Sequence, residues 1–206
     1  MSYAVWNFKG GVGKTTLSIQ LSRILDYDYV TNDEKGGAHT LVKDDRGFLI
    51  PEDLESIPFE NEVIFDFGGW KDTRIEDVLE KCDKVIVPTL KSLVDIKTTL
   101  TTLKEISEVN SNVIVVFNRF NVAKKKREDT FYDLKAYILE ELAKDDVFFD
   151  SIEFLTIRDS ELLQDCQFDG DSIYDRIENS TNKGFYNNIY RNIVSDMDNL
   201  VKTLEV

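Results

Sequence analysis

Short apolar runs alternate along the chain with longer stretches in which apolar residues recur every three or four positions. The short runs, rich in β-branched and aromatic residues, are typical of buried strands, and the longer spacing is typical of amphipathic helices. We expect strands over residues 3–8, 29–33, 62–67, 84–88, 112–118 and 151–157. We expect helices over residues 15–26, 72–82, 92–107, 127–144 and 182–204. This alternation predicts an α/β fold with a mostly parallel sheet and helices on both faces.

One segment, residues 34–61, follows neither period. Turn-forming residues interrupt it at Gly36, Gly37, Gly47, Pro51 and Pro58. We therefore expect irregular structure there. No repeat or long linker divides the rest of the chain, and 206 residues suffice for one sizeable core. The sequence predicts a single domain over residues 1–206.

Composition narrows the class of protein further. No apolar run approaches the roughly 20 residues that span a bilayer, and the first residues lack the features of a secretory signal. Cys82 and Cys166 are too few for a disulfide framework, so we expect reduced, buried thiols in a cytoplasmic protein. The net charge of −14 argues against a constitutive nucleic-acid or anionic-membrane binder, because such a field repels both.

The chemistry is concentrated in residues 8–16, FKGGVGKTT, between the first expected strand and helix. Glycines allow backbone N–H groups to approach a phosphate chain and to form a concave nest. The following helix adds the positive end of its dipole. Lys14 can reach the β- and γ-phosphates as a cation, and the Thr15 hydroxyl can ligate Mg²⁺. The segment therefore predicts a phosphate-binding loop.

The loop departs from the usual spacing G-x-x-x-x-G-K-[ST], because Phe8 occupies the position of the first glycine. A second lysine, Lys9, precedes the glycines instead. This segment resembles the deviant phosphate loop of the ParA/MinD family of partition and positioning ATPases, and in particular ParA-type plasmid or chromosome partition proteins. The resemblance implies that Lys9 reaches the nucleotide of a partner subunit. It also implies that the backbone and side chains of the loop hold ATP, over Lys9, Gly10, Gly11, Val12, Gly13, Lys14, Thr15 and Thr16.

Two acidic residues match further segments of the same family. Asp33 aligns with the second aspartate of the D-x-D-P-Q-G segment, which implies a role in orienting or activating the attacking water. Here Thr31, Glu34 and Lys35 replace the first aspartate, the proline and the glutamine of that segment. Asp66 ends an apolar strand and resembles the Walker B aspartate, whose position suits binding of Mg²⁺, usually through a water.

The later part of the chain extends the resemblance. Residues 82–89 resemble the family's A-D-x-V-I-V-P-T strand. Asn118 matches the asparagine that contacts adenine, for which an amide supplies both a donor and an acceptor. Residues 157–160 and 170–174 resemble the segment that closes over the base.

Together these features predict an ATPase that dimerises with Mg-ATP and drives DNA partition or positions a cargo. Little covalent chemistry is available to the protein in phosphoryl transfer, so positioning and charge must provide most of the catalysis. We expect Lys9, Lys14 and Asp33 to be catalytic, and Thr15 and Asp66 to hold the metal. The resemblance implies a homodimer and a ParB-like or adaptor partner.

A surface for DNA is less clearly marked in an acidic chain. The basic cluster Lys124, Lys125, Lys126 and Arg127 is the candidate contact, and a solvated loop is the alternative explanation. The final helix carries an apolar stripe at Ile189, Ile193, Met197, Leu200 and Leu204. Its polar face is not basic, so the stripe favours core packing over a membrane surface.

Two other functions compete with this interpretation. An ATP-dependent carboxylate ligase of the dethiobiotin-synthetase type shares the loop but needs a substrate pocket, for which we find no basic or aromatic constellation. A nucleotide-sensing interaction module would bind Mg-ATP with negligible turnover. An iron–sulfur reductase is disfavoured because Cys82 and Cys166 lack flanking glycines.

Overall fold

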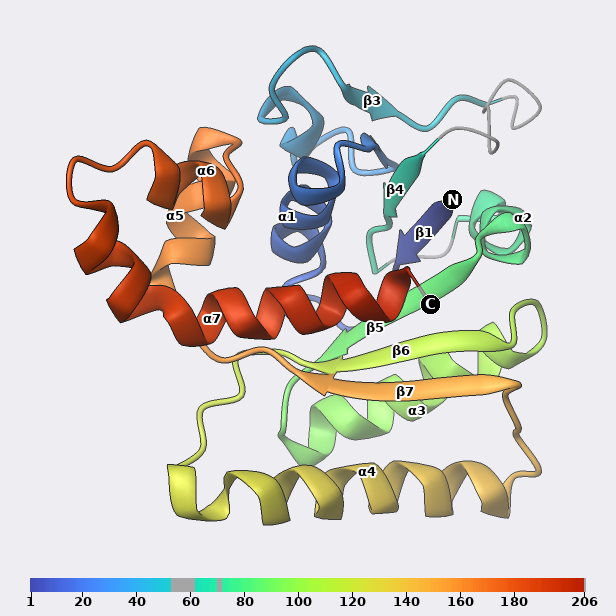
Figure 1. Cartoon of the computed structure of the whole chain (residues 1–206). Helices are drawn as coiled ribbons and strands as arrows, with labels where there is room; N and C mark the ends of the chain where they lie inside the picture. Colours follow the sequence, from blue (N-terminus) through green and yellow to red (C-terminus); the bar gives the residue numbers. More distant parts are fainter. Residues whose placement is uncertain (53–61, 70–71, 206) are drawn as a thin grey trace.

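The computed structural model describes residues 1–52, 62–69 and 72–205 (Figure 1). The strands are β1 (Ser2–Val5), β2 (Asp28–Thr31), β3 (Gly47–Leu49), β4 (Val63–Asp66), β5 (Lys84–Thr89), β6 (Asn112–Phe117) and β7 (Ser151–Thr156). The helices are α1 (Lys14–Leu25), α2 (Arg74–Lys81), α3 (Leu93–Ser107), α4 (Arg127–Lys144), α5 (Glu161–Asp169), α6 (Ile173–Glu178) and α7 (Lys183–Leu204). Among the described residues, short 3-10 helices cover Ala38–Thr40 and Lys124–Lys126.

The described strands form one sheet in the order β3-β2-β4-β1-β5-β6-β7, and every neighbouring pair is parallel. The expected parallel α/β sheet is confirmed. β1 lies at the centre, where Val5 is in register with Asp66 of β4 and Ile86 of β5. The chain leaves β1 toward β2 on one side and later returns to β5 on the other. In open α/β sheets, ligands bind outside the carboxyl ends of the strands at such a switch point.

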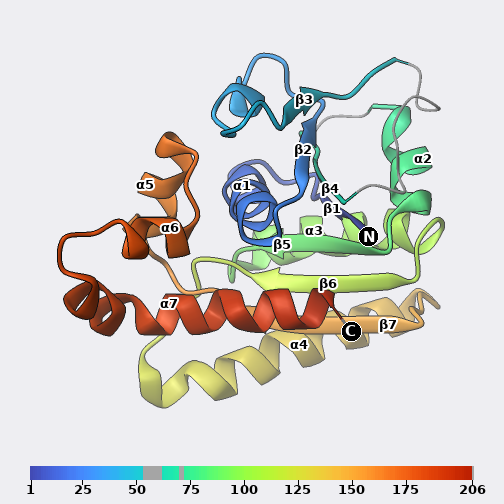
Figure 2. The same ribbon diagram turned by 45° about the horizontal axis from the view of Figure 1, so that its top comes forward.

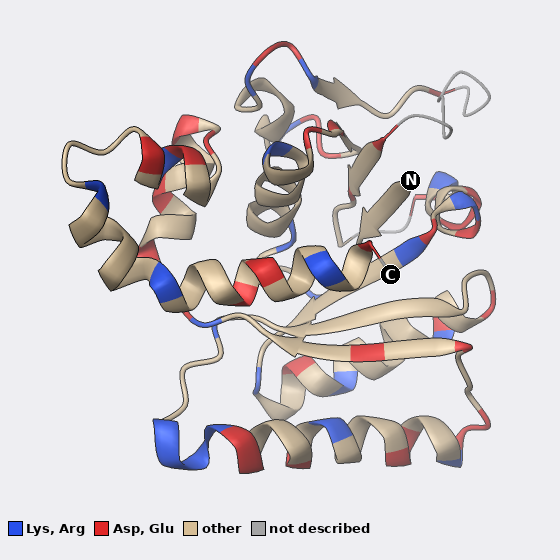
Figure 3. Cartoon of the chain, in the orientation of Figure 1, with Lys and Arg blue, Asp and Glu red and all other residues tan. Residues whose placement is uncertain are grey.

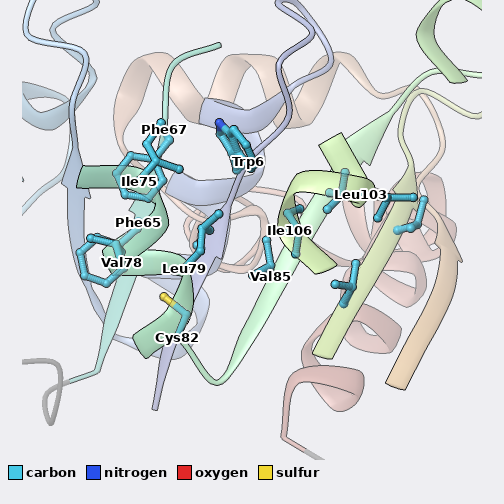
Figure 4. Close-up of a cluster of buried hydrophobic side chains, with 14 of the residues drawn as sticks. Trp6, Phe65, Phe67, Ile75, Val78, Leu79, Cys82, Val85, Leu103 and Ile106 are labelled. Atoms are coloured by element: carbon cyan, nitrogen blue, oxygen red, sulfur yellow. The ribbon is translucent and has the colours of Figure 1, made fainter. Parts of the chain in front are cut away.

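Alternation along the strands divides the apolar side chains between two cores, one on each face of the sheet. Tyr3 and Val5 face α1 and the C-terminal helices, whereas Ala4 and Trp6 face α2 and α3. Figure 4 shows part of the second core, with Trp6 near side chains from β4 and α2. In the turned view, α7 runs alongside β6 and β7, and α1 lies beside β2 and β4 (Figure 2). The sheet is therefore buried on both faces, as its apolar strands indicated.

The structure differs from the pattern-based expectations mainly around short elements. The irregular segment 34–61 contains the three-residue strand β3, and its part over residues 53–61, with Pro58, lies outside the described residues. Helices α5 and α6 were not expected, because nine and six residues are too short to establish a helical period. The start of α6 nevertheless carries a capping box, in which Ser172 and Asp175 bond reciprocally.

Two smaller expectations also have outcomes. Both cysteines are free and buried, as expected. Four members of the α7 stripe are buried in the core, but Ile189 is 50% exposed. That residue lies in the first turns of α7, which extend beyond the sheet (Figure 1). No helix in the described parts of the chain is long and apolar enough to cross a bilayer.

Candidate functional site

The glycine loop joins β1 to α1 at the carboxyl edge of the sheet. Gly11 and Gly13 have φ angles of 78° and 93°, in the region that glycine adopts without strain. A Cβ atom on Gly13 would lie well inside 3.0 Å of Asn118 Nδ2, closer than real Cβ atoms approach. Gly10 meets neither restriction, since its φ is ordinary and nothing lies within 4 Å of its Cβ position. Backbone conformation and packing therefore both require glycine at position 13.

The amino end of α1 points its backbone donors toward this loop. Leu17 N–H bonds to Gly13 O at 3.1 Å, so the preceding amides of residues 14–16 have no acceptor within the helix. The N-cap residue is Gly13, and no side chain caps this end. Free amides and the helix dipole together make this end of α1 an anion-binding position.

Lys14 lies inside the loop rather than in solvent. Its ammonium donates to the backbone carbonyl of Lys9 at 3.1 Å, and the side chain is largely buried. Burial lowers the pKa of Lys14 below its usual 10.5, and the negative charge of Asp66 opposes that shift. The Lys14 ammonium is thus held within the loop, close enough to Asp66 for the two charges to interact.

Lys9 is held more loosely at the surface. Its ammonium lies 3.7 Å from Asp95 Oδ1 of α3, and its side chain is 38% exposed. Partly exposed ion pairs of this length contribute little to stability. An anionic group of another molecule could therefore replace Asp95 as the partner of the Lys9 ammonium at a small cost in free energy.

Sequence patterns did not single out Asn7, which anchors the start of the loop. Its side chain is fully buried; Nδ2 donates to Pro88 O at 2.9 Å and to Thr99 Oγ1 at 3.0 Å. Its Oδ1 accepts from Lys9 N–H and from the Thr102 hydroxyl. The only sequence signal was an asparagine at the end of an apolar strand. Asn7 fixes the loop to β5 and α3.

Asp66 ends β4 beside the loop and is 3% exposed. The Tyr29 hydroxyl donates to its Oδ2 at 2.7 Å, whereas Oδ1 is buried without a hydrogen-bond partner in the described structure. The hydroxyls of Thr15 and Ser18 and the charge of Lys14 also act on this carboxyl, but burial dominates and raises its pKa above the usual 3.8.

These groups fit a hard divalent cation. Mg²⁺ prefers oxygen ligands and is commonly held by one or two carboxylates together with phosphates and water. The buried, unpartnered Oδ1 of Asp66 and the nearby Thr15 hydroxyl are ligands of this kind. No group of three or more His, Cys, Asp or Glu side chains suited to a metal occurs in the described ranges. Phosphate and water oxygens would complete the coordination.

Asp33 follows β2, at the same edge of the sheet. Its Oδ1 accepts from Gly36 N–H at 2.8 Å, which closes a local turn. The neighbouring Asn32, which sequence analysis did not select, accepts from Gly68 N–H at 2.8 Å and donates to Asp72 at 3.1 Å. Asn32 thereby links the segment after β2 to the segment after β4. The contact joins residues 36 positions apart and has no local sequence signal.

Asn118 also packs against the loop. Its Nδ2 donates to Val12 O at 2.8 Å, and its Oδ1 accepts from Arg119 N–H at 2.9 Å. A base contact would therefore use the second hydrogen of Nδ2 and the second lone pair of Oδ1. A narrow cavity of about 10 Å³ lies beside it, lined by Thr16, Asn118, Arg119, Arg158, Asp159, Ser160, Leu163 and Gln164. The two segments matched to base closure thus differ: the first contributes Arg158, Asp159 and Ser160 to this lining, and residues 170–174 contribute none.

The basic cluster at the start of α4 divides into two kinds of residue. Lys124, Lys125 and Lys126 form an exposed 3-10 turn at the carboxyl edge of the sheet (Figure 3). Arg127 instead turns inward, donating to Thr156 Oγ1 at 3.2 Å and lying 3.8 Å from the buried Asp196. Its guanidinium also stacks over a phenylalanine ring. The three lysines, rather than all four cations, are therefore available to a partner.

A central parallel strand, a glycine-rich loop and an uncapped helix at the switch point define a protein of the P-loop nucleotide-binding class. Residues 3–155 match the model of the CobQ/CobB/MinD/ParA nucleotide-binding domain. The chain belongs to this family, and the ParA/MinD resemblance drawn from its motifs is confirmed.

Solved structures of the family have the same fold at low sequence identity. The Cyanothece McdA(D38A)–ATP complex is 14% identical with a TM-score of 0.64, covering 100% of this chain and 96% of that one. MinD with Mg-ADP from Pyrococcus horikoshii is 12% identical with a TM-score of 0.58, covering 90% and 92%. A putative plasmid partition protein from Borrelia burgdorferi, bound to AMPPNP, is 15% identical with a TM-score of 0.56, covering 95% and 97%. No curated protein matches the chain significantly.

Proposed function

We propose that the protein binds Mg-ATP and hydrolyses it in a dimer that forms when the nucleotide binds. The observation that carries the proposal is the meeting, at one edge of the sheet, of the two groups that a metal-bound triphosphate requires. These are the Lys14 ammonium with the free amides of α1, and the unpartnered Asp66 oxygen beside Thr15. Similar structures that contain ATP, Mg-ADP or AMPPNP support the choice of nucleotide.

Each residue then has a defined role. The loop amides of residues 10–16 and Lys14 bind the phosphates and stabilise charge on the β–γ bridge. Thr15 and Asp66 hold Mg²⁺, which when bound adds positive charge against the phosphates. Asp33 orients the attacking water, and Asn118 contacts the base.

Lys9 is proposed to act on the nucleotide of the second subunit. Its partly exposed ammonium and weak pairing with Asp95 leave it free to exchange partners. A cation supplied in this way stabilises the transition state as an arginine finger does, which is worth about 10³–10⁵ in kcat. We expect Lys9→Ala to lower turnover by at least about 10³-fold while it retains nucleotide binding.

Light scattering and phosphate release test the two halves of this proposal together. We expect a doubling of mass on addition of Mg-ATP, and loss of phosphate release in Lys9→Ala at saturating ATP. Lys202→Ala, at an exposed position of α7, is the matched control for removing one lysine. An unchanged mass with Mg-ATP contradicts the dimer, and normal turnover in Lys9→Ala contradicts the role of Lys9. Tight Mg-ATP binding without phosphate release would instead support a nucleotide-sensing module.

The dimer is proposed to act on DNA or on another cargo through an adaptor. The exposed turn of Lys124, Lys125 and Lys126 is the proposed DNA-binding surface. Two copies would bring six lysines to the dimer. Binding to phosphates would weaken steeply with salt. Gel shifts with non-specific duplex DNA, with and without Mg-ATP at two salt concentrations, test this surface. No shift at low salt with Mg-ATP would leave the adaptor as the route to the cargo.

A further inference from the structure

Tyr29 is a fully buried tyrosine in β2 whose hydroxyl reaches the phosphate-binding edge. Its ring is surrounded by the small apolar cluster of Ile19, Ala38 and Val42. Its exposed fraction is 0%, and its hydroxyl donates to Asp66 Oδ2 at 2.7 Å. A phenyl ring alone would satisfy the apolar surroundings. The hydroxyl, which is costly to bury without a partner, has Asp66 as its acceptor.

The sheet register explains how one side chain connects these positions. Thr31 of β2 is opposite Asp66, so Tyr29 lies two residues earlier on the same face of the strand. Two residues correspond to roughly 6.6 Å along a strand, a span that a tyrosine side chain covers and that shorter side chains do not. The Thr31 hydroxyl is a further polar neighbour of the phenol. Tyr29 thus reaches the end of β4 from the adjacent strand.

The two carboxylate oxygens of Asp66 therefore differ in their hydrogen bonding. Oδ2 is held by Tyr29, whereas Oδ1 has no partner among the described residues although it is buried. A carboxylate fixed through one oxygen has little freedom to rotate about its terminal torsion. The other oxygen is then presented in a constant direction, on a carboxyl that also interacts with Thr15 and Lys14.

We propose that Tyr29 is a positioning residue, whose hydroxyl orients the Asp66 carboxylate so that Oδ1 is presented to the Mg²⁺ of a bound nucleotide. This inference rests on the proposed function, because it requires that Asp66 binds the Mg²⁺ of a nucleotide. Tyr29 itself is not a ligand of the metal. Partners that orient a ligating group commonly change metal affinity by 10–100-fold when they are removed. Tyr29 does not touch the nucleotide in this proposal and acts only through Asp66.

Tyr29→Phe tests the inference, since it removes one oxygen and leaves the ring. The measurement is the affinity for a fluorescent ADP analogue in excess Mg²⁺ and in EDTA. We expect the enhancement by Mg²⁺ to fall by about 10-fold or more, with the affinity in EDTA unchanged. Tyr3→Phe is the matched control, because Tyr3 is a buried tyrosine whose hydroxyl donates to Leu204 O, away from the loop. An undiminished Mg²⁺ enhancement in Tyr29→Phe overturns the inference.

A second comparison separates orientation from general damage to the site. Tyr29→Phe added to Asp66→Asn is expected to change the Mg²⁺ enhancement no further, because the group on which Tyr29 acts has been altered. A further loss of similar size overturns the inference. If the wild-type chain itself shows no Mg²⁺ enhancement, the proposed function fails instead.

A crystal structure of the wild-type protein with Mg-ADP provides a test that needs no variant to fold. We expect Tyr29 Oη to remain within hydrogen-bond distance of Oδ2, and Oδ1 to face the metal or its water. Rotation of the carboxylate, with Oδ2 toward the metal, contradicts the inference even if nucleotide binds.

Discussion

Replacing Gly13 by alanine tests how far the loop depends on its contact with Asn118. The φ angle of 93° costs an alanine roughly 1–2 kcal/mol. The new methyl group would also collide with Asn118 Nδ2 and displace it, which breaks the bond to Val12 O and costs about 1 kcal/mol more. We therefore expect the free energy of unfolding to fall by about 2–3 kcal/mol.

Urea denaturation followed by circular dichroism measures this loss. With a slope of about 2–3 kcal/mol per molar urea, the midpoint is expected to fall by about 1 M. Gly10→Ala is the control within the same loop, because its Cβ position is open and its φ is ordinary. We expect its free energy of unfolding to stay within about 0.5 kcal/mol of the wild type.

The same pair of residues allows the two contributions to be separated. In a Gly13→Ala/Asn118→Ala double variant, the collision disappears but the backbone strain stays. The two substitutions should therefore be non-additive, with a coupling of about 1 kcal/mol. An unfolding midpoint for Gly13→Ala equal to that of the wild type would refute this account of the loop. Strict additivity would refute the part assigned to Asn118.

Two further predictions concern other buried polar groups near the loop. Asn7→Ala is expected to lower the free energy of unfolding by about 2 kcal/mol or more, because it removes four hydrogen bonds and leaves Lys9 N–H without its acceptor; a urea midpoint within error of the wild type would contradict the anchoring role. Asp66→Asn is expected to stabilise the nucleotide-free protein at pH 7, because burial raises the pKa of Asp66 above 3.8 in the folded state and ionisation therefore opposes folding. The gain in stability from Asp66→Asn should be full above the folded-state pKa and should vanish below about pH 4, where the carboxyl is neutral in both states. Thermal melts of both proteins across this pH range measure the gain. A gain in stability that grows on acidification would contradict the prediction.

Much of the fold could be predicted from local features of the sequence. The strands with long apolar runs were predicted within a few residues of their ends, because burial on both faces leaves a continuous pattern. Short helices and strands could not be predicted in this way. β3 has three residues and α6 has six, so neither is long enough to show a period, and both depend on neighbours for their stability.

The candidate site divides in the same way. The glycine loop, Lys14 and Thr15 lie within nine consecutive residues, where the backbone conformation and the spacing of donors are local properties. Their presence could therefore be predicted from the sequence. The roles of Asn7 and Asn32 could not, because each depends on hydrogen bonds to segments tens of residues away.

A phosphate-binding loop between a strand and a helix can be predicted from the residues alone, since glycine conformations and helix dipoles act over a few residues. The folded chain sets which distant groups complete that loop. It placed Asn118 against Gly13, turned Arg127 toward Asp196, and set the Tyr29 hydroxyl on one oxygen of Asp66. These contacts have no local signal, because parallel strands bring together residues with no regular separation along the chain. The register of the sheet, rather than any local pattern, sets which side chains meet at its carboxyl edge.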